Sequence, residues 1–245
     1  MTRQRGASPF TPEGHLPEGA AKQQAVRSMF DAIAPRYDLV NRVMTFRMDV
    51  GWRRRTVAAL ALPGGATVVD LACGTGDLCR ELQRGGYRPI GADLSFGMLA
   101  AARTTAPLLQ GDALGLPLPA ARVDGVTCGF ALRNFVDLDA FLGEIARVVR
   151  PRGRIALLEV AEPENRVLRR GHAVYFGKVV PKIGGLLSDR DAYRYLPQSV
   201  AYLPEPEALV ARIRAAGFAD AERRPLSGGI AQLLVGTRDG GRRHG

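Results

Sequence analysis

Apolar and polar positions follow two different periods along the chain. In the first third, apolar residues recur every three or four positions, as Val26, Met29, Phe30 and Ile33 do, and this period predicts amphipathic helices. We expect one helix over 22–34 that ends at Pro35, a second around 37–43, and a third over 52–62 that starts after Gly51.

Between residues 65 and 161, short apolar runs alternate with helical stretches. Continuous apolar runs bounded by glycine and proline are typical of strands buried on both faces. The alternation of strand and helix predicts a parallel sheet with right-handed crossovers. We expect strands at 66–71, 88–92, 107–110, 123–130 and 154–160, and helices at 77–84, after the N-cap Ser95, and at 138–149.

The alternation stops at residue 161, and the next forty residues contain several glycines, prolines and tyrosines. A helix at 205–216 and two strands at 218–225 and 229–237 follow. A glycine-rich turn joins these two strands, which predicts an antiparallel pair. The fold class is therefore α/β, with a seven-stranded, mostly parallel sheet whose last strand is antiparallel.

Composition excludes several classes of protein. The chain has 245 residues, of which 46% are hydrophobic and 24% charged, as in one ordinary globular domain. It holds no apolar run long enough to span a membrane, and its polar N-terminus lacks the apolar core of a signal peptide. Cys73, Cys79 and Cys128 show no metal-ligand spacing, so we expect no metal site and a reducing, cytoplasmic setting.

The most informative motif is the decapeptide VVDLACGTGD at residues 68–77. A strand ends in Asp70, and a turn with Gly74 and Gly76 then opens a helix, which is where a doubly wound sheet binds a nucleotide. An ordinary strand–helix turn can carry the same two glycines. A carboxylate here would repel a pyrophosphate, whereas it suits S-adenosylmethionine, which has a sulfonium, an ammonium and no phosphate.

Two further acids follow the next two strands. Asp93, with Leu94 beside it, lies where an acid accepts hydrogen bonds from both ribose hydroxyls. Asp112 follows the third strand and can accept the adenine amine, while Ala113 offers a backbone amide to the ring. Each acid alone is also ordinary at a solvated strand end, but three acids at three consecutive strand ends favour a cofactor site.

Five segments outside the glycine motif carry a more specific signal. They are MFDAIAPRYDLVN at 29–41, Trp52-Arg53, FALRN at 130–134, YRYLPQS at 193–199 and LSGGI at 226–230. Over about residues 26–237 the chain resembles the ubiquinone/menaquinone biosynthesis C-methyltransferases, the family that includes demethylmenaquinone methyltransferase, within the class I S-adenosylmethionine-dependent methyltransferases. The resemblance implies a Rossmann-like sheet with a helical N-terminal extension and a lid insertion.

The resemblance also implies a division of the chain. A flexible tail (1–20) precedes a single methyltransferase domain (21–240). That domain comprises a helical N-terminal region (21–64), a cofactor-binding half (65–161), a substrate lid (162–204) and a C-terminal helix with strands (205–238).

The resemblance assigns residues as well. Together with the motif residues above, the expected cofactor contacts are Asp70, Gly74, Thr75, Gly76, Asp93, Leu94, Asp112, Ala113 and Gly129. The family has a small polar residue at the last position, so only a backbone contact is expected from glycine. It also often has histidine at Leu234, which points to a paralogue with a related but altered acceptor.

The implied reaction is C-methylation of a prenylated quinol ring, such as demethylmenaquinol to menaquinol. A phenol with a pKa near 10 needs roughly 4 kcal/mol to ionise at pH 7. We expect Arg133 to stabilise the phenolate, through a water held by Asn134 and Tyr37. A structural loop cap is the alternative for the Arg-Asn pair, and core packing is the alternative for the tyrosine.

The net charge of +10 suggests nucleic acid, an anionic membrane or an acidic substrate as partner. Residues 61–160 hold ten bases and ten acids, so the excess lies in 1–60, with ten bases and five acids, and in 161–245, with fourteen and nine. These parts flank the expected acceptor site. Candidates for an anionic lipid face are Arg53, Arg54, Arg55, Arg169, Arg170, Lys178 and Lys182; Arg242 and Arg243 suit a solvated tail.

Other functions stay open. The alternatives are a methyltransferase for another phenolic or secondary metabolite, an RNA methyltransferase and a non-catalytic cofactor-binding protein. The chain lacks an RNA-binding module and an N-P-P-Y motif, so no nucleic acid is expected. We expect a lipophilic quinol substrate and peripheral contact with an anionic membrane at its inner face, and a homodimer is compatible with the sequence.

Overall fold

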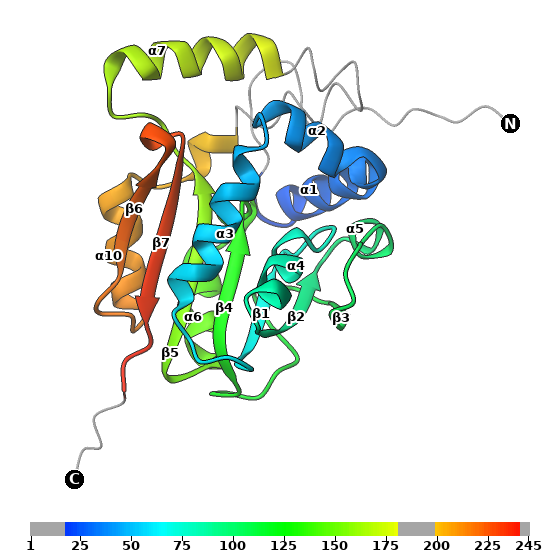
Figure 1. Ribbon diagram of the computed structural model, residues 1–245, viewed down its shortest axis with the longest axis vertical. Helices are drawn as coiled ribbons and strands as arrows, with labels where there is room; N and C mark the ends of the chain where they lie inside the picture. The colour runs from blue at the N-terminus through cyan, green and yellow to red at the C-terminus, as the bar shows by residue number, and fades with distance from the viewer. Residues whose placement is uncertain (1–17, 181–198, 241–245) are drawn as a thin grey trace, which may run out of the picture.

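A seven-stranded sheet forms the centre of the molecule (Figure 1). The computed structural model describes residues 18–180 and 199–240. The strand order is β3-β2-β1-β4-β5-β7-β6. The strands are β1 (Thr67–Leu71), β2 (Arg88–Asp93), β3 (Leu108–Gln110), β4 (Val123–Gly129), β5 (Val149–Val160), β6 (Glu222–Leu226) and β7 (Ala231–Thr237).

The strand directions agree with the sequence pattern. Strands β1 to β5 pair in parallel, whereas β7 is antiparallel to both of its neighbours. The predicted fold class is therefore confirmed. In the register, Leu71 pairs with Ala92 of β2 and with Cys128 of β4, so the carboxyl ends of these strands meet at one edge of the sheet. Residues that follow the strands are thereby brought together.

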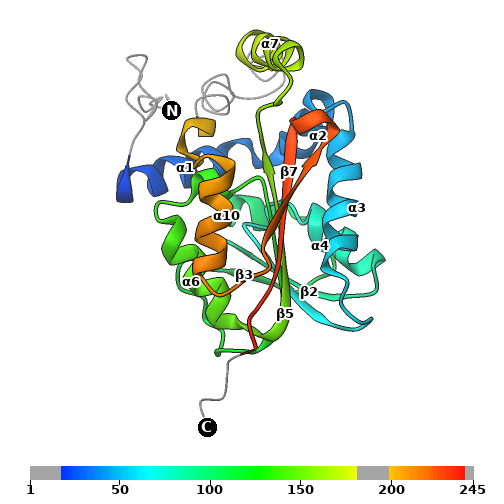
Figure 2. The same ribbon diagram turned by 90° about the vertical axis from the view of Figure 1, so that its left-hand side faces the viewer.

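Helices cover both faces of the sheet (Figure 2). Helices α3 (Met48–Leu60) and α4 (Asp77–Arg84) pack on one face, where Trp52 and Leu82 are buried against the sheet. Helices α6 (Leu138–Val148) and α10 (Pro206–Ala215) cover the other face, where Phe141 and Ile213 are fully buried. The apolar stripes predicted from the helical period are the faces that these helices bury.

Three more helices lie across the carboxyl edge of the sheet (Figures 1 and 2). They are α1 (Gly19–Ile33), α2 (Tyr37–Met44) and α7 (Arg166–Val174), and α7 continues into a π-helical turn at Tyr175–Val179. The short α5 (Phe96–Ala100) lies beneath α1, and its N-cap Ser95 accepts from the Met98 amide as predicted. One-turn 3-10 helices occur at Ala34–Arg36, Leu132–Asn134, Val200–Tyr202 and Ser227–Gly229.

The predicted start of the third helix is wrong. Helix α3 begins at Met48, and Gly51 lies inside it, where a Cβ would meet no atom within 4 Å. The first turn is held by Asp49, which accepts a hydrogen bond from the Thr45 hydroxyl at 2.7 Å and pairs with Arg53 one turn later. These contacts outweigh the low helix propensity of a single glycine.

Smaller differences concern other boundaries. Helix α1 begins at Gly19, three residues before the predicted start, β5 begins directly after α6, and β6 begins four residues later than predicted. No helix within the described residues is long and apolar enough to cross a membrane. The predicted tail up to residue 17, residues 181–198 of the predicted lid with Lys182 and all of the YRYLPQS segment except Ser199, and Arg242 and Arg243 lie outside the described residues.

Candidate active site

The glycine-rich loop joins β1 to α4 and brings backbone close to a cavity. Gly74 and Gly76 have φ values of 55° and 81°, in the left-handed region that favours glycine. A Cβ at Gly76 would lie 2.7 Å from Cγ2 of Thr104. The backbone conformation therefore favours glycine at both positions, and the approach of Thr104 requires it at Gly76.

Asp93 ties this loop to the end of β2. Its carboxylate accepts hydrogen bonds from the Gly74 amide at 2.7 Å and from the Ser95 amide at 2.8 Å. Burial raises the pKa of Asp93, although the hydrogen bonds from these backbone amides oppose the shift. The side chain thus fixes two loops and also lines the cavity beside them.

A cavity of about 100 Å³ lies at these strand ends. Six of the nine predicted cofactor residues line it: Gly74, Asp93, Leu94, Asp112, Ala113 and Gly129. Asp112 accepts hydrogen bonds from the Leu114 amide at 2.9 Å and from Nε2 of Gln23 on α1 at 2.7 Å. The predicted residues thus form the strand-end part of its wall, and we call this space the cofactor cavity.

Asp70 and Thr75 line an adjoining pocket of about 40 Å³, while Gly76 lines neither space. Asp70 is only 1% exposed and accepts from the Thr127 hydroxyl at 2.7 Å and from the Cys79 thiol at 3.5 Å. Burial raises the pKa of Asp70 to about 7. The Thr75 hydroxyl donates to the Asp38 carboxylate, so α2 is attached to the glycine loop.

A second, larger cavity of about 360 Å³ lies between α2, α3, α7 and the end of β4. Its apolar walls include Met44, Trp52, Leu168, Tyr175 and Phe176. The Trp52 indole N–H donates to Oγ of Ser227 at 2.8 Å, which holds the ring against the turn before β7. We call this space the acceptor cavity.

The two large cavities meet at two aromatic side chains. Tyr37 and Phe130 line the acceptor cavity, the cofactor cavity and the small pocket between them. Burial raises the pKa of Tyr37, so its hydroxyl keeps its proton at neutral pH and can donate a hydrogen bond. Asn134 lines the cofactor cavity and Arg133 lines the acceptor cavity. The three predicted catalytic residues therefore lie around this junction.

Arg133 has a partner that the sequence did not reveal. It is 5% exposed and forms an ion pair with Glu159, a fully buried carboxylate near the end of β5. Its guanidinium also donates to the Phe130 carbonyl at 2.8 Å and to Oγ of Ser199 at 3.0 Å. The expectation of a cation in the cleft therefore needs amending, because the positive charge is paired and the guanidinium is held rigidly.

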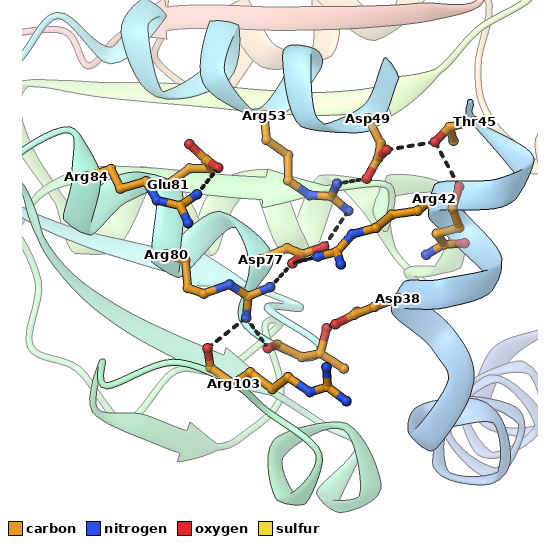
Figure 3. A network of polar contacts seen from close by, with 12 residues as sticks. Asp38, Arg42, Thr45, Asp49, Arg53, Asp77, Arg80, Glu81, Arg84 and Arg103 are labelled. Atoms are coloured by element: carbon orange, nitrogen blue, oxygen red, sulfur yellow. Dashed lines mark hydrogen bonds and ion pairs between the residues drawn. The ribbon is translucent and has the colours of Figure 1, made fainter. Parts of the chain in front are cut away.

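A network of charges joins the N-terminal helices to the glycine loop (Figure 3). Asp77, the first residue of α4, pairs with Arg42 at 3.4 Å, with Arg53 at 3.3 Å and with Arg80. Arg53 also pairs with Asp49 and is only 7% exposed. The prediction that Arg53 belongs to a lipid-facing surface is wrong, because its charge is buried between two carboxylates.

Sequence reasoning missed the contribution of α1. Gln23, Arg27 and Phe30 line the cofactor cavity. Asp31 anchors the helix there, since its carboxylate accepts from the Ser95 hydroxyl at 2.6 Å and from the Gly97 amide at 2.9 Å. The apolar period of α1 indicated a packed helix but not the element against which it packs.

The donors and acceptors of the cofactor cavity fit S-adenosylmethionine. Carboxylates at Asp93 and Asp112 suit ribose hydroxyls and an adenine amine, and glycine backbone leaves room for close approach. Asp70 borders the small pocket, where its carboxylate suits the cationic groups of S-adenosylmethionine and would repel a phosphate. The sheet order and this cavity define a class I S-adenosylmethionine-dependent methyltransferase.

Comparisons with known proteins identify the family. The model of the ubiE/COQ5 methyltransferase family matches residues 18–238, so the chain belongs to that family. It is 44% identical over 220 residues to the demethylmenaquinone methyltransferase of Thermus thermophilus, covering 86% of this chain and 100% of the relative. It is 40% identical over 226 residues to the ubiquinone/menaquinone biosynthesis C-methyltransferase of Syntrophotalea carbinolica, covering 88% and 94%.

A solved structure shows the same fold. It is a putative methyltransferase in complex with the Trm112 activator of Haloferax volcanii, with a TM-score of 0.65 at 21% identity over 89% of this chain and 100% of that chain. The enzyme class agrees with the one that the family resemblance implied, and the cofactor, S-adenosylmethionine, agrees with the one that the strand-end acids favoured.

Proposed function

We propose that the protein transfers a methyl group from S-adenosylmethionine to a ring carbon of a prenylated quinol, converting demethylmenaquinol to menaquinol. The observation that carries the proposal is the apolar acceptor cavity of about 360 Å³, which shares Tyr37 and Phe130 with the cofactor cavity. A lipophilic ring suits such walls. The names of the two relatives support the same substrate class.

Each cofactor residue has a proposed role. Asp93 accepts hydrogen bonds from the ribose hydroxyls, and Asp112 accepts one from the adenine amino group. The backbone amide of Ala113 donates a hydrogen bond to a nitrogen of the adenine ring. Leu94 packs on the adenosine, Gly74 and Gly129 allow backbone approach, and Thr75 with Asp70 borders the methionine end. Gly76 acts indirectly, since it shapes the loop that carries Gly74 and Thr75. The bound cofactor supplies an electrophilic methyl group on sulfur.

The residues of the acceptor cavity activate the ring by stabilising the negative charge on its oxygen and by positioning its carbon for methyl transfer. Glu159 fixes the Arg133 guanidinium, which donates to the quinol oxygen as the phenolate forms. Tyr37 and Asn134 hold a water that takes the phenolic proton toward solvent. Once the ring carbon has taken the methyl group, the hydrogen that this carbon carried moves to the ring oxygen through the same water and restores the quinol. Donor and acceptor meet at the Tyr37–Phe130 junction, so the protein's largest contribution is near-attack positioning.

The first test is methyl transfer from labelled S-adenosylmethionine to a short-chain demethylmenaquinol, a panel of simple phenols and a structured RNA. We expect turnover with the prenylated quinol and much less with the phenols. Preferred methylation of a phenol without a prenyl chain, or of the RNA, would overturn the proposal.

The second test addresses Arg133. Arg133→Ala is expected to retain cofactor affinity by isothermal titration and to lose most turnover, since only the acceptor side is changed. Arg133→Lys keeps the charge but not the planar fork, and an intermediate rate is expected. Unchanged turnover in Arg133→Ala would remove this residue from the mechanism.

The alternative of another phenolic acceptor rested partly on Leu234. This side chain is fully buried in β7 and lines none of the three cavities, so it does not favour a different acceptor. We also propose peripheral contact with an anionic membrane. A homodimer stays a prediction, which light scattering of the purified protein measures directly.

A further inference from the structure

Exposed apolar side chains gather at one end of the molecule. In the described part of the chain, nine large apolar side chains are exposed, and seven of them lie on α2, α7 or the turns that follow these helices. The seven are Leu39, Val43, Phe46, Val167, Leu168, Val174 and Val179. Scattered exposed apolar residues need no explanation, but a cluster of this kind marks an interaction surface.

The part contributed by α2 forms a stripe. Leu39 and Val43 lie one turn apart on the helix and are 57% and 41% exposed, and Phe46 continues the stripe at 70%. The Phe46 ring packs against the Tyr175 ring with 5.6 Å between centroids. The Tyr175 hydroxyl also donates to the Met44 carbonyl at 2.7 Å. The apolar surfaces of α2 and α7 are therefore continuous.

Helix α7 has no buried residue and carries apolar side chains on two sides. Leu168 and Tyr175, seven residues apart, line the acceptor cavity. Val167 and Val174, also seven residues apart, are 79% and 56% exposed. Val174 lines no part of that cavity, and Val167 stays largely exposed although it borders the cavity, so both valines present apolar surface to the outside of the molecule.

The charges on α7 indicate what that surface is. Residues 166–180 contain Arg166, Arg169, Arg170 and Lys178 and no acid. Arg166 and Arg170 lie one turn apart, and Arg170 precedes Val174 by one turn, so basic and apolar side chains share the outer side of the helix. A two-fold contact through this helix would gather the arginines of both copies, with no acid from the helix, in one interface. Basic residues beside exposed valines suit an anionic lipid surface instead.

The same end of the molecule borders the acceptor cavity. Phe46, Val167 and Leu168 are exposed and also line that cavity. A lipophilic substrate held in a bilayer would therefore meet the cavity wall at the place where the protein presents its apolar cluster. Figures 1 and 2 both show α2 and α7 at the carboxyl end of the sheet.

We propose that the outer surface of α2, Phe46 and α7 docks onto an anionic membrane and aligns the acceptor cavity with the lipid. This inference rests on the proposed function, since it supplies a route for a prenylated substrate. Compared with the lipid face predicted from the sequence, this surface leaves out Arg53 and adds Arg166 and the apolar stripe of α2. It retains Arg169 and Arg170.

The test compares variants that leave the cavity walls intact. Leu39→Ser, Val43→Ser and Val174→Ser combined change three exposed side chains that line none of the cavities described above. Vesicles of phosphatidylcholine with and without phosphatidylglycerol are sedimented with each protein. We expect the combined variant to bind anionic vesicles about tenfold more weakly or worse. The matched control is Phe96→Ser, since Phe96 is 64% exposed on α5, away from this surface, and we expect it to bind like the unmodified protein.

A charge variant separates the two contributions. Arg166→Gln with Arg170→Gln should abolish most of the preference for phosphatidylglycerol and reduce the salt dependence of binding. Unchanged vesicle binding by both variants would overturn the docking surface. A shift from dimer to monomer in light scattering, with unchanged vesicle binding, would overturn it too and assign the surface to contact between copies.

Turnover distinguishes this inference from the proposed function. With a short-chain quinol in detergent, the combined variant should match the unmodified protein, whereas with a long-chain quinol in anionic vesicles it should be several-fold slower. Absence of quinol methylation by the unmodified protein would instead refute the proposed function, whatever the vesicles show.

Discussion

The cofactor cavity and the acceptor cavity share two side chains but are built differently. The first is formed at strand ends, where carboxylates such as Asp93 and Asp112 accept hydrogen bonds from nearby backbone amides. The second is formed between helices, with apolar walls and two buried ion pairs, Arg133–Glu159 and Arg53–Asp49. Local sequence determines the first, whereas contacts between distant segments determine the second.

The largest expected effect concerns the Arg133–Glu159 ion pair of the acceptor cavity. Glu159→Ala leaves the Arg133 guanidinium buried without its carboxylate, and such losses cost about 3–5 kcal/mol. Urea denaturation measures the free energy of unfolding. Glu159→Gln, which keeps an acceptor of similar shape, should cost less than Glu159→Ala.

An exposed pair of the same chemistry provides the control. Arg212 and Asp139 lie 3.0 Å apart with side chains 45% and 68% exposed, so Asp139→Ala should change the free energy of unfolding by less than about 1 kcal/mol. If Glu159→Ala costs no more than this control, the acceptor cavity does not depend on the Arg133–Glu159 ion pair, and the contrast between the two cavities fails.

The second prediction concerns the cofactor cavity. Asp93→Asn should weaken cofactor binding by at least tenfold, since each charge-assisted hydrogen bond contributes about 1.5–3 kcal/mol. Part of the loss comes through Gly74, whose amide would face a neutral acceptor. Isothermal titration with S-adenosylhomocysteine measures the affinity, with Asp139→Asn as the surface control. Wild-type affinity in Asp93→Asn would contradict the ribose assignment.

The same contrast explains what the sequence could predict. Strand runs, Gly74 and the acids after each strand are local signals, and they located the strand-end wall of the cofactor cavity. The Arg133–Glu159 pair joins the 3-10 turn after β4 to a residue of β5 that lies 26 positions later, and no spacing rule connects them. An acid at the end of the apolar run RIALLEV was the one available hint.

The error at Arg53 has the same origin. Its place in a run of three arginines suggested a solvated basic patch, but Asp49 one turn earlier and Asp77 on another helix bury it. The partner on the same helix was visible as an i, i+4 spacing, whereas the partner on α4 depends on how the N-terminal helices dock. Sequence periodicity shows that a helix packs, but not on what.

The third prediction uses the titration of Asp70. Its pKa rises from 3.8 to about 7 in the folded protein, because the carboxylate is buried. A cationic ligand next to it favours the ionised form, so cofactor affinity should rise with pH up to about 7 and then level off. At pH 6 the affinity should be about tenfold below the plateau, with release of close to one proton on binding. Titration in buffers of different ionisation enthalpy measures that proton.

The contribution of Asp70 to the free energy of unfolding should change with pH in the opposite direction to cofactor affinity. Between pH 4 and 7 the folded protein holds a proton on Asp70 that the unfolded chain has lost, so this residue makes folding less favourable as the pH rises. Asp70→Asn should remove both dependences while keeping an acceptor for the Thr127 hydroxyl. If cofactor affinity depends on pH in the same way in the variant and in the unmodified protein, Asp70 does not belong to the cofactor site.

The smallest expected effect tests whether α1 belongs to the cofactor cavity. Gln23 donates to Asp112 at 2.7 Å, so Gln23→Ala removes one hydrogen bond from a carboxylate proposed to bind adenine. We expect cofactor affinity to fall by a few-fold, about 0.5–1.5 kcal/mol, with no change in the Michaelis constant for the quinol. Gln24→Ala, on the exposed side of the same helix, is the control. If Gln23→Ala changes only the Michaelis constant for the quinol, α1 belongs to the acceptor cavity instead. A helix that contacts only the adenosine could not alter quinol binding while cofactor affinity stays the same.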